Sequence, residues 1–272
     1  MKFTIIGSKG FIGSNLVDYF KKNEIEYSEI DINDKRIFSE KLGHVIYAIG
    51  MTSDFRNNTF NTIKSHVCIL NELLNTVKFD SFLYLSSARI YYGQKNTQEE
   101  NSININSIDP DKLYNISKIM GESICFSSNK DNVRVVRLSN VIGKDFSSNN
   151  FIFSLIKDAI KKNEINLNTS LESEKDYINI KDVVKILPEI SINGKEKLYN
   201  IASGKNIKTE KIVEIINNKL GNQVKINHTT KKIIFPCISI QKIMDEFRFE
   251  STSVLDMLPN LINEFNTFIR KK

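Results

Sequence analysis

The sequence predicts an α/β fold in which a doubly wound parallel sheet of the Rossmann type is followed by a smaller mixed α/β region. Three observations support this prediction. Apolar strand-like runs alternate with amphipathic helical patterns over residues 1–143. The first run breaks into a glycine-rich turn and then resumes as a helical pattern. The alternation loosens after that, which predicts a second region over residues 144–272.

The amino-terminal region alternates between the two kinds of element without interruption. Strands that are apolar along their whole length are typical of parallel sheets, because helices cover both faces of such a sheet. The predicted strands are residues 3–6, 27–32, 45–49, 82–85 and 133–138, and the predicted helices are residues 11–22, 60–77 and 113–126.

The carboxyl-terminal region carries shorter and more mixed patterns. We expect it to pack over the carboxyl ends of the first sheet and to return some segments to it. The predicted helices are residues 151–162, 182–187, 209–220, 240–246 and 253–269, and the predicted strands are residues 165–167 and 177–180.

The glycine turn is typical of a dinucleotide-binding site, although an ordinary structural turn is the alternative. Gly7 permits the tight turn, Gly10 lets backbone N–H groups approach a pyrophosphate, and Gly13 lets the helix lie close to the sheet. The helix dipole then stabilises the phosphate charge. The predicted cofactor-binding residues of this turn are Gly7, Lys9, Gly10, Phe11, Ile12 and Gly13.

An acidic residue, Asp31, follows the second predicted strand. It stands about twenty residues beyond the glycine turn, where a carboxylate would meet an adenosine ribose. Such a carboxylate repels a 2′-phosphate, so we expect NAD(H) to be favoured. Lys9, Lys35 and Arg36 are basic residues that could instead bind the phosphate, so NADP(H) stays open.

The composition is that of a globular protein and argues against several classes of function. The net charge is +6, but the lysines are scattered without one basic stripe, so we expect no nucleic-acid partner. No run approaches the ~20 apolar residues of a membrane span. Met1 and Lys2 lead directly into a strand without a secretory signal. The three cysteines are widely separated, which predicts a reducing cytoplasm and no metal site.

A proton-transfer pair is predicted on the helix of residues 113–126. Tyr114 and Lys118 are one turn apart on one helix face. A phenol titrates near ~10 in water, and a neighbouring ammonium together with an oxidised nicotinamide would lower that pKa. Ser87 ends a predicted strand and could hydrogen-bond an oxygen whose charge changes in hydride transfer. A chance pair and a serine-rich loop cap are the alternatives.

Taken together, these stretches resemble the extended short-chain dehydrogenase/reductases, the NAD-dependent epimerase/dehydratase family that modifies nucleotide sugars. The matching motifs follow the family order over nearly the whole chain. They are the glycine turn with Asp31, Ser87-Ala88-Arg89-Ile90-Tyr91, Tyr114 and Lys118 with Glu122, residues 137–143 around Asn140, residues 175–183, and residues 199–204.

The resemblance implies a role for each matching residue. Ser87 would orient the substrate oxygen, and Tyr114 would be the acid/base. Lys118 would hold the nicotinamide ribose and tune Tyr114, so that both side chains also contact the cofactor. Arg89 and Asn140 would contact the nucleotide sugar together with Ser87 and Tyr114.

The resemblance also implies an organisation for the whole chain. Residues 1–143 would bind the dinucleotide and residues 144–272 mainly the substrate, and the protein would form a homodimer. Lys175 stands where the family has arginine, and Tyr92 stands where glycine is usual. These departures leave the nucleotide and the sugar open.

Three reaction types compete within this resemblance. Family dehydratases carry two acids directly after the serine or threonine, whereas this chain has Ala88 and Arg89, so dehydration is not expected. The short carboxyl-terminal region favours a 4-ketoreductase acting on a 4-keto-6-deoxy nucleoside-diphosphate sugar. An NAD-dependent 4-epimerase is the alternative. A non-catalytic dinucleotide-binding protein would have little use for Ser87, Tyr114 and Lys118 together.

Overall fold

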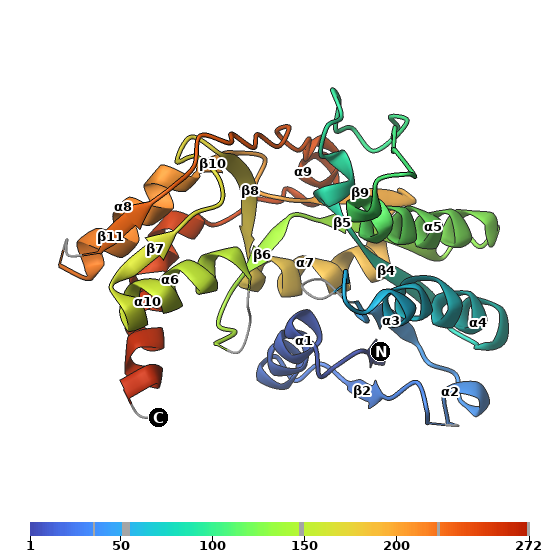
Figure 1. Ribbon diagram of the computed structural model, residues 1–272. Helices are drawn as coiled ribbons and strands as arrows, with labels where there is room; N and C mark the ends of the chain where they lie inside the picture. Colours follow the sequence, from blue (N-terminus) through green and yellow to red (C-terminus); the bar gives the residue numbers. More distant parts are fainter. Residues whose placement is uncertain (35, 51–54, 147–149, 222–223, 271–272) are drawn as a thin grey trace.

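Six parallel strands form the central sheet of the computed structural model, which describes residues 1–34, 36–50, 55–146, 150–221 and 224–270 (Figure 1). Their order is β2-β1-β3-β4-β5-β9. The chain moves from β1 outward to β2 and then crosses to β3 on the other side of β1, which creates the switch point where doubly wound sheets bind ligands. The strands are β1 (Phe3–Ile6), β2 (Tyr27–Ile30), β3 (His44–Tyr47), β4 (Ser81–Ser87), β5 (Val133–Leu138) and β9 (Leu198–Ile201).

Helices cover both faces of this sheet, so the predicted Rossmann-type α/β fold is confirmed. Successive residues of a strand point to opposite faces. In β1, Ile5 belongs to the hydrophobic cluster on one face and Ile6 to the cluster on the other. The first cluster contains α1 (Phe11–Lys22), α7 (Ile180–Asn193) and α9 (Gln241–Phe247), and the second contains α4 (Ile69–Thr76) and α5 (Leu113–Ser127), with α2 (Arg36–Ser39) at its edge.

The remaining elements form a second body with its own core. In Figure 1, α6, α8, α10, β7 and β11 gather at the left, away from α2 and α4. Two small sheets, ordered β10-β8-β6 and β11-β7, carry these helices. None of the described helices has both the length and the apolar character needed to cross a membrane. The elements are β6 (Asn140–Ile142), α6 (Phe151–Lys162), β7 (Glu164–Asn166), β8 (Glu174–Asn179), β10 (Asn206–Lys208), α8 (Thr209–Lys219), β11 (Lys225–Asn227) and α10 (Val254–Arg270).

Two helices differ from their predicted bounds by more than a residue or two at an end. The helix expected over residues 60–77 consists of α3 (Thr59–Ile63), a π-helical turn (Lys64–Cys68) and α4. A π turn hardly disturbs apolar spacing, so the pattern does not reveal it. Helix α7 continues to Asn193 instead of ending before Pro188. The proline removes one N–H donor from the helix. Helix α7 continues past it because its apolar side chains on both sides of Pro188 are buried in the first core.

Strand β9 was not expected, although its residues lie in one of the family-like motifs. It pairs with β5 and completes the central sheet from a point far along the chain. A four-residue strand is difficult to distinguish from other short apolar segments in a sequence. The chain beyond residue 143 therefore supplies β9, α7 and α9 to the first core.

A buried polar network joins α5 to the carboxyl half of the central sheet. The Arg137 guanidinium donates to both carboxylate oxygens of Glu122, at 3.0 and 2.7 Å. Ser86 donates to the same carboxylate at 2.5 Å. Arg137 also donates to the Tyr91 hydroxyl at 2.6 Å, and Tyr91 in turn donates to Asn200 in β9 at 2.9 Å. The network thus connects β4, β5, β9 and α5 in the core.

We predict that Arg137→Met lowers the free energy of unfolding by about 3–5 kcal/mol, because it leaves the Glu122 carboxylate buried without its counter-charge. Urea-induced unfolding followed by circular dichroism measures the change. The matched control is Lys197→Met, which removes the exposed ion pair to Asp131 and should change stability by no more than about 1 kcal/mol. Equal effects of the two substitutions would contradict the prediction.

Candidate active site

The glycine turn between β1 and α1 has the geometry of a phosphate cradle. Gly7 has φ of +96°, and a Cβ there would stand 2.8 Å from the backbone nitrogen of Ile49. A Cβ at Gly13 would stand 2.1 Å from the Gly7 oxygen, so α1 can approach the sheet only with glycine there. Gly10 has an ordinary φ of −75° and caps α1 without a side-chain hydrogen bond. Its missing side chain therefore leaves the helix N-terminus open to a ligand.

The next two predicted cofactor-binding residues form the first turn of α1. Phe11 and Ile12 are partly buried and pack against the first core. A Cβ at Gly143 would stand 3.2 Å from the Phe11 ring, so the turn lies close to the start of the carboxyl-terminal region. Their backbone N–H groups belong to the open end of the helix and suit an anionic group.

Asp31 and Lys9 face each other at the ends of β2 and the glycine turn. The Lys9 ammonium lies 4.0 Å from the Asp31 carboxylate, and both side chains are exposed. The other Asp31 oxygen accepts hydrogen bonds from the backbone and side chain of Asn33, each at 3.0 Å. Arg36 begins α2, while Lys35 lies outside the described residues. The structure thus places the carboxylate of Asp31 next to the ammonium of Lys9.

Ser87, Tyr114 and Lys118 come together where β4 meets α5. Ser87 is the last residue of β4 and accepts a hydrogen bond from the Arg89 N–H at 3.2 Å, which caps the 3₁₀ turn Ala88–Tyr91. The Ser87 hydroxyl lies close enough to the Tyr114 phenol to lower its pKa. The Lys118 ammonium donates to the Leu85 oxygen at 2.8 Å. All three predicted catalytic side chains are therefore within one cluster.

Burial controls the ionisation of this cluster. Tyr114 is 4% exposed, and burial raises the pKa of its phenol, while the Ser87 hydrogen bond and Arg89 oppose the rise. Burial therefore outweighs the combined effect of Ser87 and Arg89 on the pKa of Tyr114. Burial also lowers the pKa of Lys118 to about 7, an effect that Glu122 partly offsets. The phenol stays protonated at neutral pH and can act as a proton donor.

The predicted substrate residues occupy two sides of the cluster. The Arg89 guanidinium lies over the rings of Tyr114 and Phe55, at 5.6 and 5.1 Å from their centroids. Asn140 is exposed, and its amide N–H donates to the backbone oxygen of Asp176 at 2.8 Å. The contact ties Asn140 to β8 and leaves its side-chain oxygen available as an acceptor.

Two further residues near the cluster escaped the sequence reasoning. Lys175 lies between the Phe151 and Phe235 rings, and burial together with the Arg89 charge lowers its pKa. In the sequence, Lys175 was noticeable only because it stands where the family has arginine. His66 is fully buried in the π turn, with its ring edge-on to Tyr114 at a centroid distance of 5.4 Å. One histidine within a helical pattern gives no signal in the sequence.

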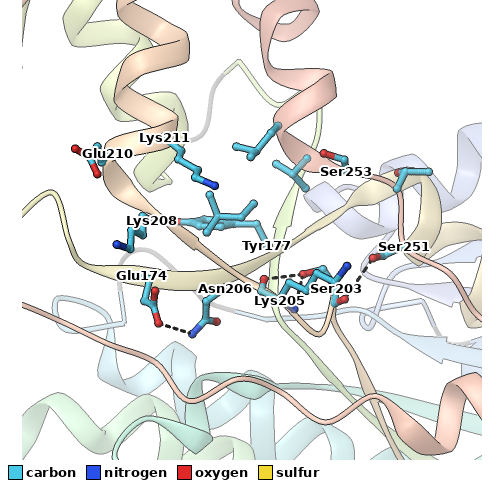
Figure 2. Close-up of a pocket in the computed structure, with 14 residues that line it drawn as sticks. Glu174, Tyr177, Ser203, Lys205, Asn206, Lys208, Glu210, Lys211, Ser251 and Ser253 are labelled. Atoms are coloured by element: carbon cyan, nitrogen blue, oxygen red, sulfur yellow. Dashed lines mark hydrogen bonds between the residues drawn. The ribbon is translucent and has the colours of Figure 1, made fainter.

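A separate hollow of about 630 Å³ opens in the carboxyl-terminal region, lined by parts of β8, β10, α8 and α10. Figure 2 shows Lys208 and Lys211 beside the Tyr177 ring, with Glu174 bonded to Asn206 below them. The hollow has the size of a small-molecule site. Ser87, Tyr114 and Lys118 are not among its lining residues, so the hollow is separate from the predicted catalytic cluster.

Known proteins share both the motifs and the fold. A model of the NAD dependent epimerase/dehydratase family matches residues 3–202. The chain belongs to this family. This membership confirms the resemblance drawn from the motifs and accounts for the Rossmann-type sheet with its glycine turn.

Individual members of the family differ in reaction. The chain is 26% identical over 206 residues to the dTDP-4-dehydro-6-deoxyglucose reductase of Escherichia coli, which covers 71% of this chain and 63% of that protein. It is 24% identical over 255 residues to a Methanocaldococcus jannaschii protein assigned provisionally as a UDP-glucose 4-epimerase, covering 80% and 82%. The structure of the Thermotoga maritima UDP-glucose 4-epimerase with UDP-glucose superimposes with a TM-score of 0.85, at 16% identity and 99% and 100% coverage. The similarity to the Thermotoga maritima structure shows only that the two proteins share a fold.

Proposed function

We propose that the protein is a nucleotide-sugar 4-ketoreductase that reduces the C4 carbonyl of a 4-keto-6-deoxy nucleoside-diphosphate sugar. The observation that carries the proposal is the cluster of Ser87, Tyr114 and Lys118, in which Tyr114 and Lys118 are buried. The E. coli relative, a reductase by name, supports it. Arg89 stands where dehydratase chemistry would need an acid.

In the proposed reaction a bound nicotinamide cofactor supplies the hydride. Tyr114 gives its phenolic proton to the sugar oxygen as negative charge develops there, and Ser87 hydrogen-bonds that oxygen. The Lys118 ammonium then stabilises the phenolate until a solvent proton returns. Since burial raises the pKa of Tyr114, the side chain begins the reaction in the protonated state that a reduction requires.

We propose that Arg89 and Lys175 meet the diphosphate of the substrate. Within the described residues neither cation forms an ion pair, although both are partly buried and the Arg89 charge lowers the pKa of Lys175. Two buried cations of this kind are unfavourable unless an anion joins them. A diphosphate supplies two negative charges at that place.

A 4-epimerase is the second candidate. It is favoured by the M. jannaschii relative, which matches over more of both chains than the reductase does. An epimerase removes hydride from C4 and returns it to the other face of the same sugar, so Tyr114 would first act as a base. The raised pKa of the phenol argues for the reductase.

We predict stoichiometric oxidation of added NADH when the purified protein is mixed with a dTDP- or UDP-linked 4-keto-6-deoxyhexose. The loss of nicotinamide absorbance measures it. Tyr114→Phe should lower kcat by roughly 10²–10⁴ while substrate still binds, because only the proton donor is lost. Interconversion of C4 epimers without added NADH and without absorbance change would establish the epimerase instead.

We propose NAD(H) as the preferred cofactor on the basis of Asp31. Asp31→Ala should raise the affinity for NADPH relative to NADH by about tenfold or more, because a 2′-phosphate no longer meets a carboxylate. Fluorescence titration with both cofactors measures the ratio. The matched control is Asp18→Ala, an exposed acid on α1 that should leave the ratio unchanged. A wild-type protein that binds NADPH tenfold more tightly than NADH would reverse the assignment.

We also propose a homodimer formed through α5 and its neighbour α3. Met120 and Phe126 on α5 are 51% and 40% exposed, and Phe60 on α3 is 74% exposed. Large exposed apolar side chains on neighbouring helices are typical of an interface. Met120→Glu together with Phe60→Glu should convert the dimer to monomers in sedimentation velocity, and a wild-type protein that sediments as a monomer would exclude the interface.

A further inference from the structure

The hollow of about 630 Å³ in the second body lies where α8 and α10 begin (Figure 2). Residues of β8 and β10 line it together with the first turns of both helices. Asn179 in β8 donates to the Thr252 hydroxyl at 3.0 Å, and Thr252 donates to Asp182 at 2.8 Å. Both bonds fix the segment that leads into α10, so the hollow has defined walls.

Tyr177 lines this hollow from β8 with a hydroxyl that has no protein partner. Its side chain is 2% exposed, and its ring packs in the core of the second body. No hydrogen bond to its hydroxyl is found within the described residues. In contrast, the buried phenols of Tyr47, Tyr91 and Tyr199 each donate to a protein acceptor, at 2.5, 2.9 and 2.7 Å. Because a buried hydroxyl without a partner is unfavourable, the position of this one points to a ligand in the hollow.

Three lysines also line the hollow. Lys205 precedes β10, Lys208 ends β10, and Lys211 belongs to the first turn of α8. None of the three forms an ion pair with another residue that the structure describes. Glu174 and Glu210 line the hollow too, so the lysines exceed the acids by three to two. The positive end of the α10 dipole adds to this excess, so the hollow favours an anion.

One part of the lining is apolar and is formed by Ile207, Val254 and Leu255. The volume is typical of a small-molecule site and is much larger than one inorganic anion requires. A matching ligand therefore carries both an anionic group and an organic part. Arg89 and Lys175, which we assign to the diphosphate of the sugar substrate, are not among the lining residues, so the hollow is separate from that site.

We propose that the hollow is a second ligand site, which binds an organic phosphate monoester through the Tyr177 hydroxyl and the ammonium groups of Lys208 and Lys211. Figure 2 shows both lysines beside the Tyr177 ring. A phosphate monoester has three terminal oxygens and up to two charges, so it can accept hydrogen bonds from all three groups at once. A carboxylate has only two oxygens and one charge. The organic part of the ligand contacts the apolar lining.

The first experiment measures the affinity of the unaltered protein for 1-naphthyl phosphate by isothermal titration calorimetry. Inorganic phosphate and 1-naphthol each supply one half of this probe. We expect 1-naphthyl phosphate to bind at least about tenfold more tightly than either half, and its affinity to fall as salt screens the lysines. Equal affinity for 1-naphthol would show that the hollow recognises no anion, and an absence of binding would exclude the site.

Matched variants locate the bound probe. Tyr177→Phe keeps the ring and removes only the hydroxyl, so the affinity for 1-naphthyl phosphate should fall by about tenfold. Lys208→Gln together with Lys211→Gln should lower it by about tenfold as well, because two cations are lost. Lys219→Gln, at the other end of α8, is the control and should leave the affinity unchanged. Unchanged affinity in both the tyrosine and the lysine variants would contradict the proposal.

The second experiment is a crystal structure of the unaltered protein with 1-naphthyl phosphate. We expect a phosphate oxygen within hydrogen-bond distance of the Tyr177 hydroxyl and the naphthyl ring against the apolar lining. A water molecule alone on that hydroxyl would overturn the proposal even if every variant failed to fold.

A further variant distinguishes this site from the site of the sugar substrate. Lys175→Gln should leave the affinity for 1-naphthyl phosphate unchanged, because Lys175 does not line the hollow. If Lys175→Gln abolishes binding while Tyr177→Phe does not, the probe occupies the substrate site and the proposal is wrong. None of these measurements needs a sugar substrate or turnover, so a protein without ketoreductase activity can still confirm the second site.

Discussion

The ion pair between Glu122 and Arg137 holds α5, the helix that carries Tyr114 and Lys118, on the sheet. Glu122 lies one turn beyond Lys118 on α5, and its carboxylate also receives the hydroxyl of Ser86, the neighbour of Ser87 in β4. One buried carboxylate therefore contacts both the strand that ends at Ser87 and the helix that carries Tyr114. With both partners at most 5% exposed, the charges tolerate burial only while they remain paired. The distance between Ser87 and Tyr114 follows from this constraint.

Much of the fold and the cluster could be predicted because both depend on short-range patterns. The glycine turn requires glycine at positions 7 and 13 for reasons of backbone geometry alone, and the structure shows the close approaches that explain them. Tyr114 and Lys118 share a helix face at fixed spacing, and Ser87 ends a strand that is buried up to that residue. Parallel strands place their carboxyl ends at one edge, so these elements meet without further information.

The rest depends on contacts that no local pattern encodes. His66 enters the cluster because a π turn and Gly121 bring two helices together, and neither residue carries a recognisable spacing. The raised pKa of Tyr114 in the structure could not be read from the sequence, because the burial that causes it depends on packing against residues distant in the chain, such as Phe55. Lys175 reaches Arg89 from β8, a strand of the second body.

The late position of β9 in the chain has a consequence for how the molecule is made. Asn200 accepts from Tyr91 and donates its backbone N–H to Glu99, and both contacts join residues about a hundred positions apart. Closing such loops is slow, because chain entropy is lost before the contacts form. On the ribosome, β5 remains an unpaired sheet edge until residue 201 has emerged. Until β9 has been synthesised, the nascent chain must therefore avoid pairing the exposed edge of β5 with a strand of another chain.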